Sequence, residues 1–280
     1  MNIRPGVLLL IVFTMQGTEL QQDTVKAWQE YIGSANARMQ ARLRPEIPFL
    51  KVDEDQHWIS NIQTGEILIS HGGSQGLTRV PSGLIHDWFG AVFIPQTTLN
   101  NVLSVVRDYN RYKQFYQPTV VDSKTISIDG FKDRFSMVLV DKSLVGETAF
   151  AGDYRCLNVR VNDRRWYSVS ESTRIREIQS YGTSNEHMLQ DGEGTGLLWR
   201  VFSIARFEER DGGVFVEFEV IALSRDVPAS LRWVVEPIVR RVSRNSLITS
   251  LRQTEDAVRA GRWLADPDRL SIAILPSRPF

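Results

Sequence analysis

Cysteine is nearly absent from this chain of 280 residues, which narrows the chemistry that the protein can carry out. A single cysteine, Cys156, excludes an intramolecular disulfide and any multi-cysteine metal site. Histidine is scarce as well, and His57, His71, His86 and His187 show none of the close spacings that bind a metal. We therefore expect no metal and no cofactor, and we interpret Cys156 as a half-buried strand residue rather than a catalytic thiol.

Net charge is also lacking, because 33 lysines and arginines balance 33 aspartates and glutamates. No global field favours nucleic acid or an anionic membrane, so any such contact needs a local patch. We expect no nucleic-acid partner, and the sequence leaves the oligomeric state open. Hydrophobic residues make up 42% of the chain and aromatic residues 10%, a composition typical of a protein that folds around a core.

The apolar run near the N-terminus is too short to span a bilayer. It extends from Gly6 to Met15, follows Arg4 and precedes the polar residues 16–19. This layout is that of a secretory signal peptide. We predict that residues 1–17 are a signal and that the protein is exported to the periplasm or the cell exterior. The alternatives are a buried N-terminal strand or a wrongly assigned start codon, either of which would leave the protein cytoplasmic.

Apolar periodicity predicts the order of the remaining elements. Helical spacing over Asp23 to Leu43 predicts an amphipathic helix, and residues 66–70 a short strand. Residues 84–94 predict a longer strand, and helical spacing then continues up to Pro118. Six strands with no helical pattern between them follow: Thr119 to Ile128, Arg134 to Lys142, Glu147 to Val161, Arg165 to Ile178, Thr195 to Glu208 and Gly213 to Arg225.

The last strand and the segment after it carry the clearest patterns. Val214, Val216, Phe218 and Val220 alternate with Glu217 and Glu219, so we expect one buried and one solvated face. A long helical pattern begins after Pro228, and Pro237 is expected to kink it or to separate two helical pieces.

The order of strand, helix pair, six antiparallel strands and long terminal helix resembles the START-like, polyketide cyclase/dehydrase and coenzyme Q-binding superfamily. The similar segments are GLIHDWFGAVFIPQTTL (Gly83 to Leu99), VVRDYNRYKQFYQPTVVDS (Val105 to Ser123) and PASLRWVVEPIVRRVSRNSLITSLRQTEDAV (Pro228 to Val258). The resemblance implies an α+β helix-grip fold, in which a curved antiparallel sheet of about seven strands surrounds the terminal helix. The relatives that it implies are uncharacterised bacterial secreted proteins with an extra N-terminal helix.

This resemblance divides the chain into four parts. After the signal, residues 18–80 form the N-terminal helix and a connecting segment, residues 81–260 form the helix-grip domain, and residues 261–280 form an extension. The superfamily has no universal catalytic signature, so no catalytic residue is carried over.

A cavity between sheet and terminal helix would take a hydrophobic ligand. We expect its wall to come from the last strand and that helix, with Trp233 as a fluorescent reporter of binding. The expected lining residues are Val216, Phe218, Val220, Trp233, Val234 and Ile238.

The strand over residues 165–178 offers two faces, and alternation alone does not choose between them. If the face with Tyr167 and Val169 is inward, Glu171 becomes a carboxylate in an apolar cavity, with a raised pKa. The opposite face would put Trp166 and Arg174 inside. A surface position on a solvated face is the alternative for each.

Two further patterns are weaker indications. Residues 72–76 have the G-x-S-x-G spacing of a hydrolase, but a strand rather than a helix follows them, so we interpret them as a loop. The arginines beside the apolar stripe of the terminal helix, Arg232, Arg240, Arg241 and Arg244, form either a solvated face or a patch for transient membrane contact.

The sequence thus predicts a protein that binds or transports a hydrophobic or amphipathic small molecule, such as a lipid, a quinone or a polyketide-like compound. The first alternative is an enzyme of the cyclase or dehydratase type with Glu171 or a tyrosine as acid or base. The second is an interaction module without a cavity. Binding without catalysis is the preferred hypothesis, because no nucleophile, base and orienting group occur together at motif spacing.

Overall fold

The computed structural model describes residues 20–73, 76–143, 146–227 and 229–261. Within these ranges the side chains of residues 141–143, 146–148, 231, 234–235 and 238–239 are not described. The predicted signal and almost all of the predicted C-terminal extension therefore lie outside the described residues.

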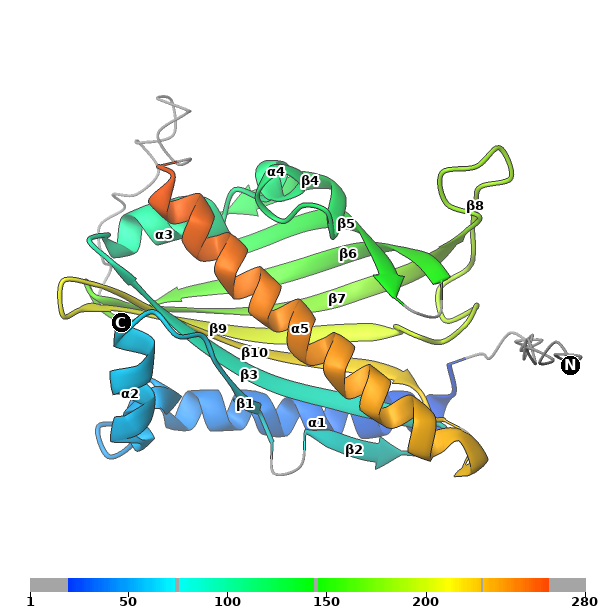
Figure 1. Ribbon diagram of the computed structural model, residues 1–280, viewed down its shortest axis with the longest axis horizontal. Helices are drawn as coiled ribbons and strands as arrows, with labels where there is room; N and C mark the ends of the chain where they lie inside the picture. Colours follow the sequence, from blue (N-terminus) through cyan, green and yellow to red (C-terminus); the bar gives the residue numbers. More distant parts are fainter. Residues whose placement is uncertain (1–19, 74–75, 144–145, 228, 262–280) are drawn as a thin grey trace, which may run out of the picture.

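A single antiparallel sheet of ten strands forms the centre of the molecule (Figure 1). Its strand order is β1-β3-β10-β9-β7-β6-β5-β4, with β2 paired to β3 and β8 paired to β7. The short strands are β1 (Leu68–His71), β2 (Leu77–Val80) and β8 (His187–Met188). The seven long strands are β3 (Gly83–Pro95), β4 (Val120–Asp129), β5 (Lys132–Ser143), β6 (Gly146–Arg160), β7 (Arg165–Gln179), β9 (Arg200–Arg210) and β10 (Gly213–Arg225).

Helices cover both sides of this sheet. Before it come α1 (Gln22–Ala41), the 3-10 turn η1 (Lys51–Glu54) and α2 (Gln56–Gln63). After β3 come α3 (Leu99–Val106), η2 (Tyr109–Arg111) and α4 (Tyr112–Phe115), and after β10 come η3 (Ala229–Leu231) and α5 (Arg232–Arg259). No described helix has the length and apolar character that crossing a membrane requires.

The two sides of the sheet belong to two separate hydrophobic clusters. On what we call the inner face, Trp88 and Val92 of β3 pack with Leu247 and Leu251 of α5. On the outer face, Ile85 and Phe89 of β3 pack with the buried stripe of α1, which is Trp28, Ile32, Ala35 and Met39. Figure 1 shows α5 in orange across one side of the sheet and α1 in blue on the other. Twelve of the thirteen residues of β3 are buried, because its two faces belong to these two clusters.

The predicted fold class is confirmed: the protein is α+β, with a long terminal helix held by a curved antiparallel sheet in the helix-grip arrangement. Two details differ from the sequence prediction. The helical pattern after Pro228 forms one continuous helix through Pro237 rather than two pieces. The predicted strand at Thr195 begins five residues later, at Arg200, after a loop that contains Gly194 and Gly196 in left-handed conformations.

The predicted solvated face of β10 is wrong. Glu217 is fully buried and Glu219 is 6% exposed, because α1 and η1 cover the outer face at this point. Alternation alone cannot reveal this cover, since charged residues at every second position are typical of a strand with one wet face.

Close approach of α5 to the sheet depends on Gly90 at the middle of β3. A Cβ atom at this position would lie 2.7 Å from Leu251 Cδ1 and 2.9 Å from Ile69 Cδ1. Because these distances are shorter than van der Waals contact, a side chain here would push α5 away from β3.

Leu251→Ala is expected to lower the free energy of unfolding by about 2–5 kcal/mol, because Leu251 is fully buried against β3 and its loss leaves a cavity. Urea unfolding followed by circular dichroism measures this change. Leu43→Ala is the matched control, since Leu43 is 39% exposed and its truncation should cost much less. Equal costs for the two variants would show that α5 is peripheral to the core.

Candidate functional site

The middle of the inner face keeps accessible surface although α5 lies over one side of it. Directly paired residues of neighbouring strands point to the same side of a sheet. Val220 of β10 therefore shares a row with Ser203 of β9 and Ser170 of β7, and Phe218 shares the next row with Ala205 and Ser168. All six side chains are only partly buried.

Tyr112 and Tyr116 of the α4 turn extend this accessible surface. The surrounding protein desolvates both rings, and burial raises the pKa of Tyr116 to about 12. Both nevertheless keep accessible surface. Both rings pack against the inner-face cluster, so they extend its partly accessible surface.

Closely packed residues surround the accessible centre. Val92 and Leu251 are fully buried, and Phe207 and Trp166 are buried at the end of the sheet near α3. The Tyr116 hydroxyl lies 3.1 Å from the Thr254 hydroxyl and so connects α4 to α5. The inner face thus has a partly accessible middle beside its closely packed contact with α5.

A stacked set of aromatic rings continues from this wall toward β6. Tyr112 meets Tyr109 edge to face at 5.4 Å between ring centroids. Tyr109 stacks on Phe135 at 4.2 Å, and Phe135 stacks on Tyr154 at 5.0 Å. These rings come from η2, β5 and β6, and they form a buried cluster that supports Tyr112 from behind.

A buried carboxylate, Asp133 of β5, fixes the position of these rings. Its Oδ2 accepts hydrogen bonds from the Tyr109 hydroxyl at 2.8 Å and from Asn158 Nδ2 at 2.8 Å. Arg107 donates to both of its carboxylate oxygens, at 3.0 and 3.1 Å. Burial raises the pKa of neighbouring Cys156 to about 12, so this thiol stays protonated, as expected of a structural cysteine.

The predicted lining residues of β10 differ in accessibility. Phe218 and Val220 lie on the accessible middle of the inner face, whereas Val216 is fully buried. Trp233 is 80% exposed on α5 and does not share this surface. The side chains of Val234 and Ile238 lie outside the described residues, so their part in a binding site stays a prediction.

The structure separates the two faces of β7 that the sequence left open. Trp166 is on the inner face with Phe207, and Glu171 is on the outer face with Tyr167 and Val169. Glu171 accepts a hydrogen bond from Arg155 at 2.7 Å. A bulge at Thr173 then reverses the alternation, which places Arg174 on the outer face, paired with Asp153. Neither predicted charged residue points toward the accessible apolar surface.

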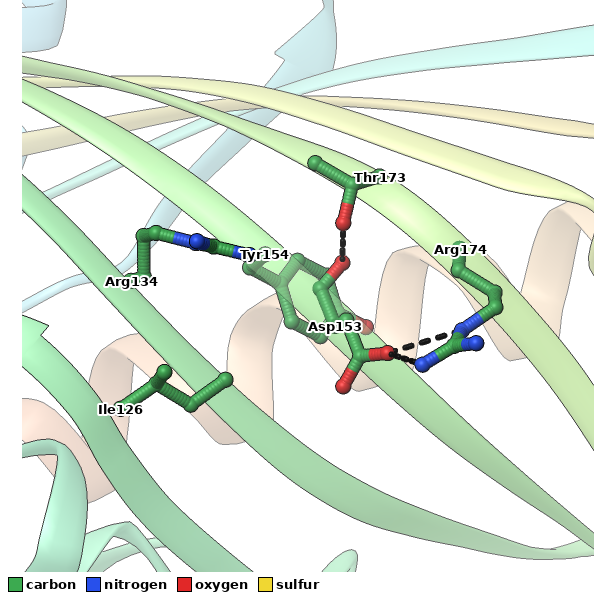
Figure 2. Close-up of a pocket in the computed structure, with 6 residues that line it drawn as sticks. All are labelled: Ile126, Arg134, Asp153, Tyr154, Thr173 and Arg174. Atoms are coloured by element: carbon green, nitrogen blue, oxygen red, sulfur yellow. Dashed lines mark hydrogen bonds and ion pairs between the residues drawn. The ribbon is translucent and has the colours of Figure 1, made fainter.

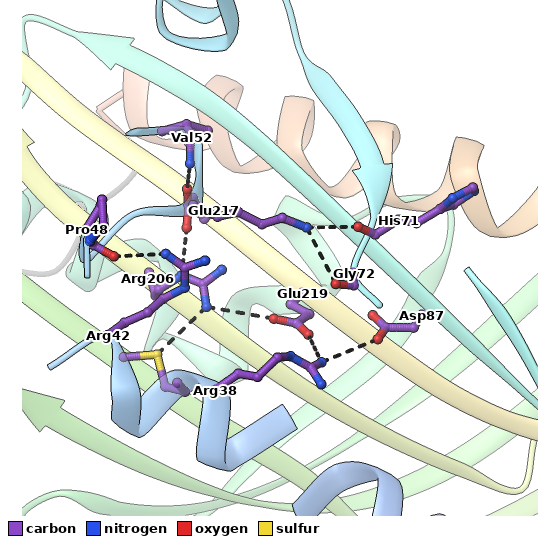
Figure 3. A network of polar contacts seen from close by, with 12 residues as sticks. Arg38, Arg42, Pro48, Val52, His71, Gly72, Asp87, Arg206, Glu217 and Glu219 are labelled. Atoms are coloured by element: carbon purple, nitrogen blue, oxygen red, sulfur yellow. Dashed lines mark hydrogen bonds and ion pairs between the residues drawn. The ribbon is translucent and has the colours of Figure 1, made fainter. Parts of the chain in front are cut away.

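The buried outer face holds an ionic network that the sequence analysis did not find (Figure 3). Arg206 of β9 is 1% exposed and donates from Nε to Glu217 Oε2 at 2.6 Å. The Val52 amide of η1 donates to the other oxygen of Glu217 at 2.9 Å. Arg38 of α1 donates to Glu219 Oε1 at 2.8 Å. These contacts tie α1 and η1 to the central strands.

Asp87 of β3 lies at the edge of this network. Its Oδ2 accepts a hydrogen bond from the Tyr31 hydroxyl at 2.9 Å, while no described group hydrogen-bonds its buried Oδ1. Burial and the nearby Glu219 raise the pKa of Asp87 to about 6. A Cβ atom at Gly72 would lie 1.7 Å from Asp87 Oδ1, so only glycine fits beside this carboxylate.

A separate open cleft of about 410 Å³ lies on the outer face of β4 to β7 (Figure 2). Its lining is mostly polar, with the Arg174–Asp153 ion pair on one side and Arg134 on another. It is not the apolar pocket that the sequence predicts. Among the described residues no cluster of three or more metal-ligating side chains occurs.

Asp87→Asn should change the pH dependence of stability. The pKa of Asp87 rises from the ordinary value of 3.8, which applies to the unfolded chain, to about 6 in the folded protein. The contribution of Asp87 to the free energy of unfolding is therefore fully present below pH 3.8 and is lost as the pH rises through 6. Wild type should therefore lose up to about 3 kcal/mol relative to the variant between pH 4 and 7. Urea unfolding across this range measures the difference, and a flat difference would contradict the argument.

The neighbouring His86 provides a control of opposite sign. Burial, together with Arg240, lowers its pKa from 6.5 to about 4, so its contribution is present above pH 6.5 and is lost as the pH falls through 4. His86→Asn should remove a stability term that rises with pH, whereas Asp87→Asn removes one that falls.

No protein family and no curated protein sequence matches this chain. Solved structures do show similarity, among them a STAR-related lipid transfer protein from Xanthomonas axonopodis, with 13% identity, a TM-score of 0.43 and coverage of 69% of this chain and 98% of that one. The Zhui aromatase/cyclase of a Streptomyces species shows 10% identity, a TM-score of 0.40 and coverage of 62% and 94%. Human STARD10 shows 8% identity, a TM-score of 0.41 and coverage of 78% and 83%. Similarity at this level identifies neither a ligand nor a reaction.

Proposed function

We propose that the protein binds a hydrophobic or amphipathic small molecule on the inner face of the sheet and does not convert it. The observation that carries this proposal is the accessible apolar middle of that face, around Phe218, Val220 and Ala205, beside the closely packed contact of α5 with β3. Exposed apolar surface in such a position is costly in water, and an apolar ligand would relieve that cost.

Two serine hydroxyls supply the polar part of this proposed site. Ser170 and Ser203 are direct partners across β7 and β9 and lie in the same row as Val220. Neither hydroxyl is hydrogen-bonded to another group in the described part of the chain. A ligand with one hydroxyl, carbonyl or carboxylate group could be oriented there while its apolar body lies against the aromatic wall.

The geometry favours binding over the cyclase or dehydratase alternative. Glu171, the predicted acid or base, lies on the outer face and is paired with Arg155. Burial raises the pKa of both wall tyrosines, Tyr112 and Tyr116, so they remain protonated and act as hydrogen-bond donors rather than bases.

Filling the proposed site should abolish binding without unfolding the protein. Ser203→Phe places a large ring in the middle of the inner face, so saturable binding of the apolar dye N-phenyl-1-naphthylamine, measured by its fluorescence, should fall at least about tenfold. Ser136→Phe is the matched control, because Ser136 is also a half-buried strand serine but shares the outer face with Asp153. Its dye binding should be unchanged.

Extraction of the purified protein, followed by mass spectrometry, then identifies the natural ligand. Recovery of an unchanged lipid, quinone or polycyclic compound supports a carrier. Turnover of a bound compound would favour the enzyme. Absence of saturable dye binding to the wild type would leave the interaction module as the better hypothesis.

Export remains part of the proposal. Residues 1–17 lie outside the described residues, so the case still rests on the sequence pattern alone. Protein isolated from the cell envelope should begin near Thr18 when its N-terminus is sequenced. Soluble cytoplasmic protein that retains Met1 would overturn this part.

A further inference from the structure

The first half of α5 presents an exposed aromatic residue to solvent. Trp233 is 80% exposed, whereas large aromatic side chains in a folded protein are mostly buried. Pro237, Arg241 and Arg244 follow it at helical spacing and are also exposed. Residues separated by three or four positions share one face of a helix, so these four form a continuous strip. We call this strip the α5 outer strip.

The α5 outer strip carries positive charge that no residue in the described part of the chain pairs with. Neither Arg241 nor Arg244 forms an ion pair or hydrogen bond with another residue of the described chain. Glu236 is the only acidic residue between Arg232 and Arg252, and it is paired with Arg79 of β2. The charge of the whole chain is zero, so this strip is a local patch rather than part of a general basic surface.

We propose that the α5 outer strip binds the surface of a lipid bilayer that contains anionic headgroups. Trp233 would lie at the level of the headgroups, where an indole ring has both apolar and polar surroundings. Arg241 and Arg244 would contact the lipid phosphates, which guanidinium groups bind with two parallel hydrogen bonds. This charge complementarity selects an anionic membrane over a neutral surface.

The position of the strip fits a reversible contact with the membrane surface. The C-terminal half of α5 is held against the sheet through Leu247 and Leu251, and Glu236 near the start of the helix is fixed by Arg79. The helix can therefore present the strip without leaving the fold. None of the four strip residues belongs to the hydrophobic cluster of the inner face, so membrane binding and ligand binding can be tested separately.

The test is cosedimentation of the full-length protein with phosphatidylcholine vesicles that either contain or lack phosphatidylglycerol. Wild type should bind the anionic vesicles, and Arg241→Glu with Arg244→Glu should weaken this binding at least about tenfold. Lys124→Glu with Lys132→Glu is the matched control. It makes the same change in charge at two exposed lysines of β4 and β5 and should have little effect.

The role of Trp233 has its own readout. Vesicles with brominated acyl chains should quench part of the wild-type tryptophan emission, and this part should be missing in Trp233→Phe. Phe131→Ala, at a 50% exposed aromatic residue on the β4–β5 turn, should not alter vesicle binding. Binding that is equal for neutral and anionic vesicles, or that the two lysine substitutions weaken as much as the two arginine substitutions, would overturn the proposal.

Dye binding in the absence of vesicles distinguishes the two proposals. The double arginine variant should bind N-phenyl-1-naphthylamine as the wild type does, because neither arginine lies on the inner face. If neither the wild type nor any variant binds the dye, but the wild type still binds the anionic vesicles, the proposed function fails and the membrane contact stands.

Discussion

Two carboxylates on β10 determine how the N-terminal part of this protein must fold. Glu217 and Glu219 point to the outer face at the centre of the sheet, where they are buried. A buried charge without partners is strongly destabilising. Arg206 on the neighbouring strand donates to one oxygen of Glu217, and the other carboxylate oxygens need further donors. The Val52 amide and Arg38 supply the rest, so α1 and η1 form part of the same cooperative structure as the sheet. The sequence prediction had placed residues 18–80, as an N-terminal helix and a connecting segment, outside the helix-grip domain.

The same strands explain how much of the fold was predictable. The periods of two and of about 3.6 residues predicted most of the long strands and the helices, because central strands such as β3 and β10 have apolar faces. The polar cover on the outer face was not predictable, since Glu217 and Glu219 look like surface residues until α1 is placed over them. The sequence also could not show which side chains of β7 face inward. The bulge at Thr173 changes this assignment, and it depends on pairing with β6 rather than on local sequence.

The candidate site was predicted in outline and missed in composition. Phe218 and Val220 lie on the accessible middle of the inner face. The other residues of these two rows are serines and an alanine on β7 and β9, which the sequence analysis did not name. Serine and alanine carry no strong signal in a strand, and their effect appears only when α5 packs toward β3 and leaves them uncovered. The tyrosines at 112 and 116 were within a segment that resembled the superfamily, but their place on the wall depends on packing between α4 and α5.

The burial of the Arg206 network has a consequence for how the protein responds to ionic strength. Mobile ions screen charges that water can reach, with a Debye length of about 8–10 Å near physiological salt, and they affect sealed pairs far less. The network around Glu217 is closed to solvent, whereas the arginines of the α5 outer strip are open to it. A rise in salt therefore weakens the interactions of the exposed strip and of Arg38, which is 46% exposed, and leaves the sealed Arg206–Glu217 pair almost untouched. Salt should therefore affect the binding surface of α5 more strongly than it affects the stability of the sheet.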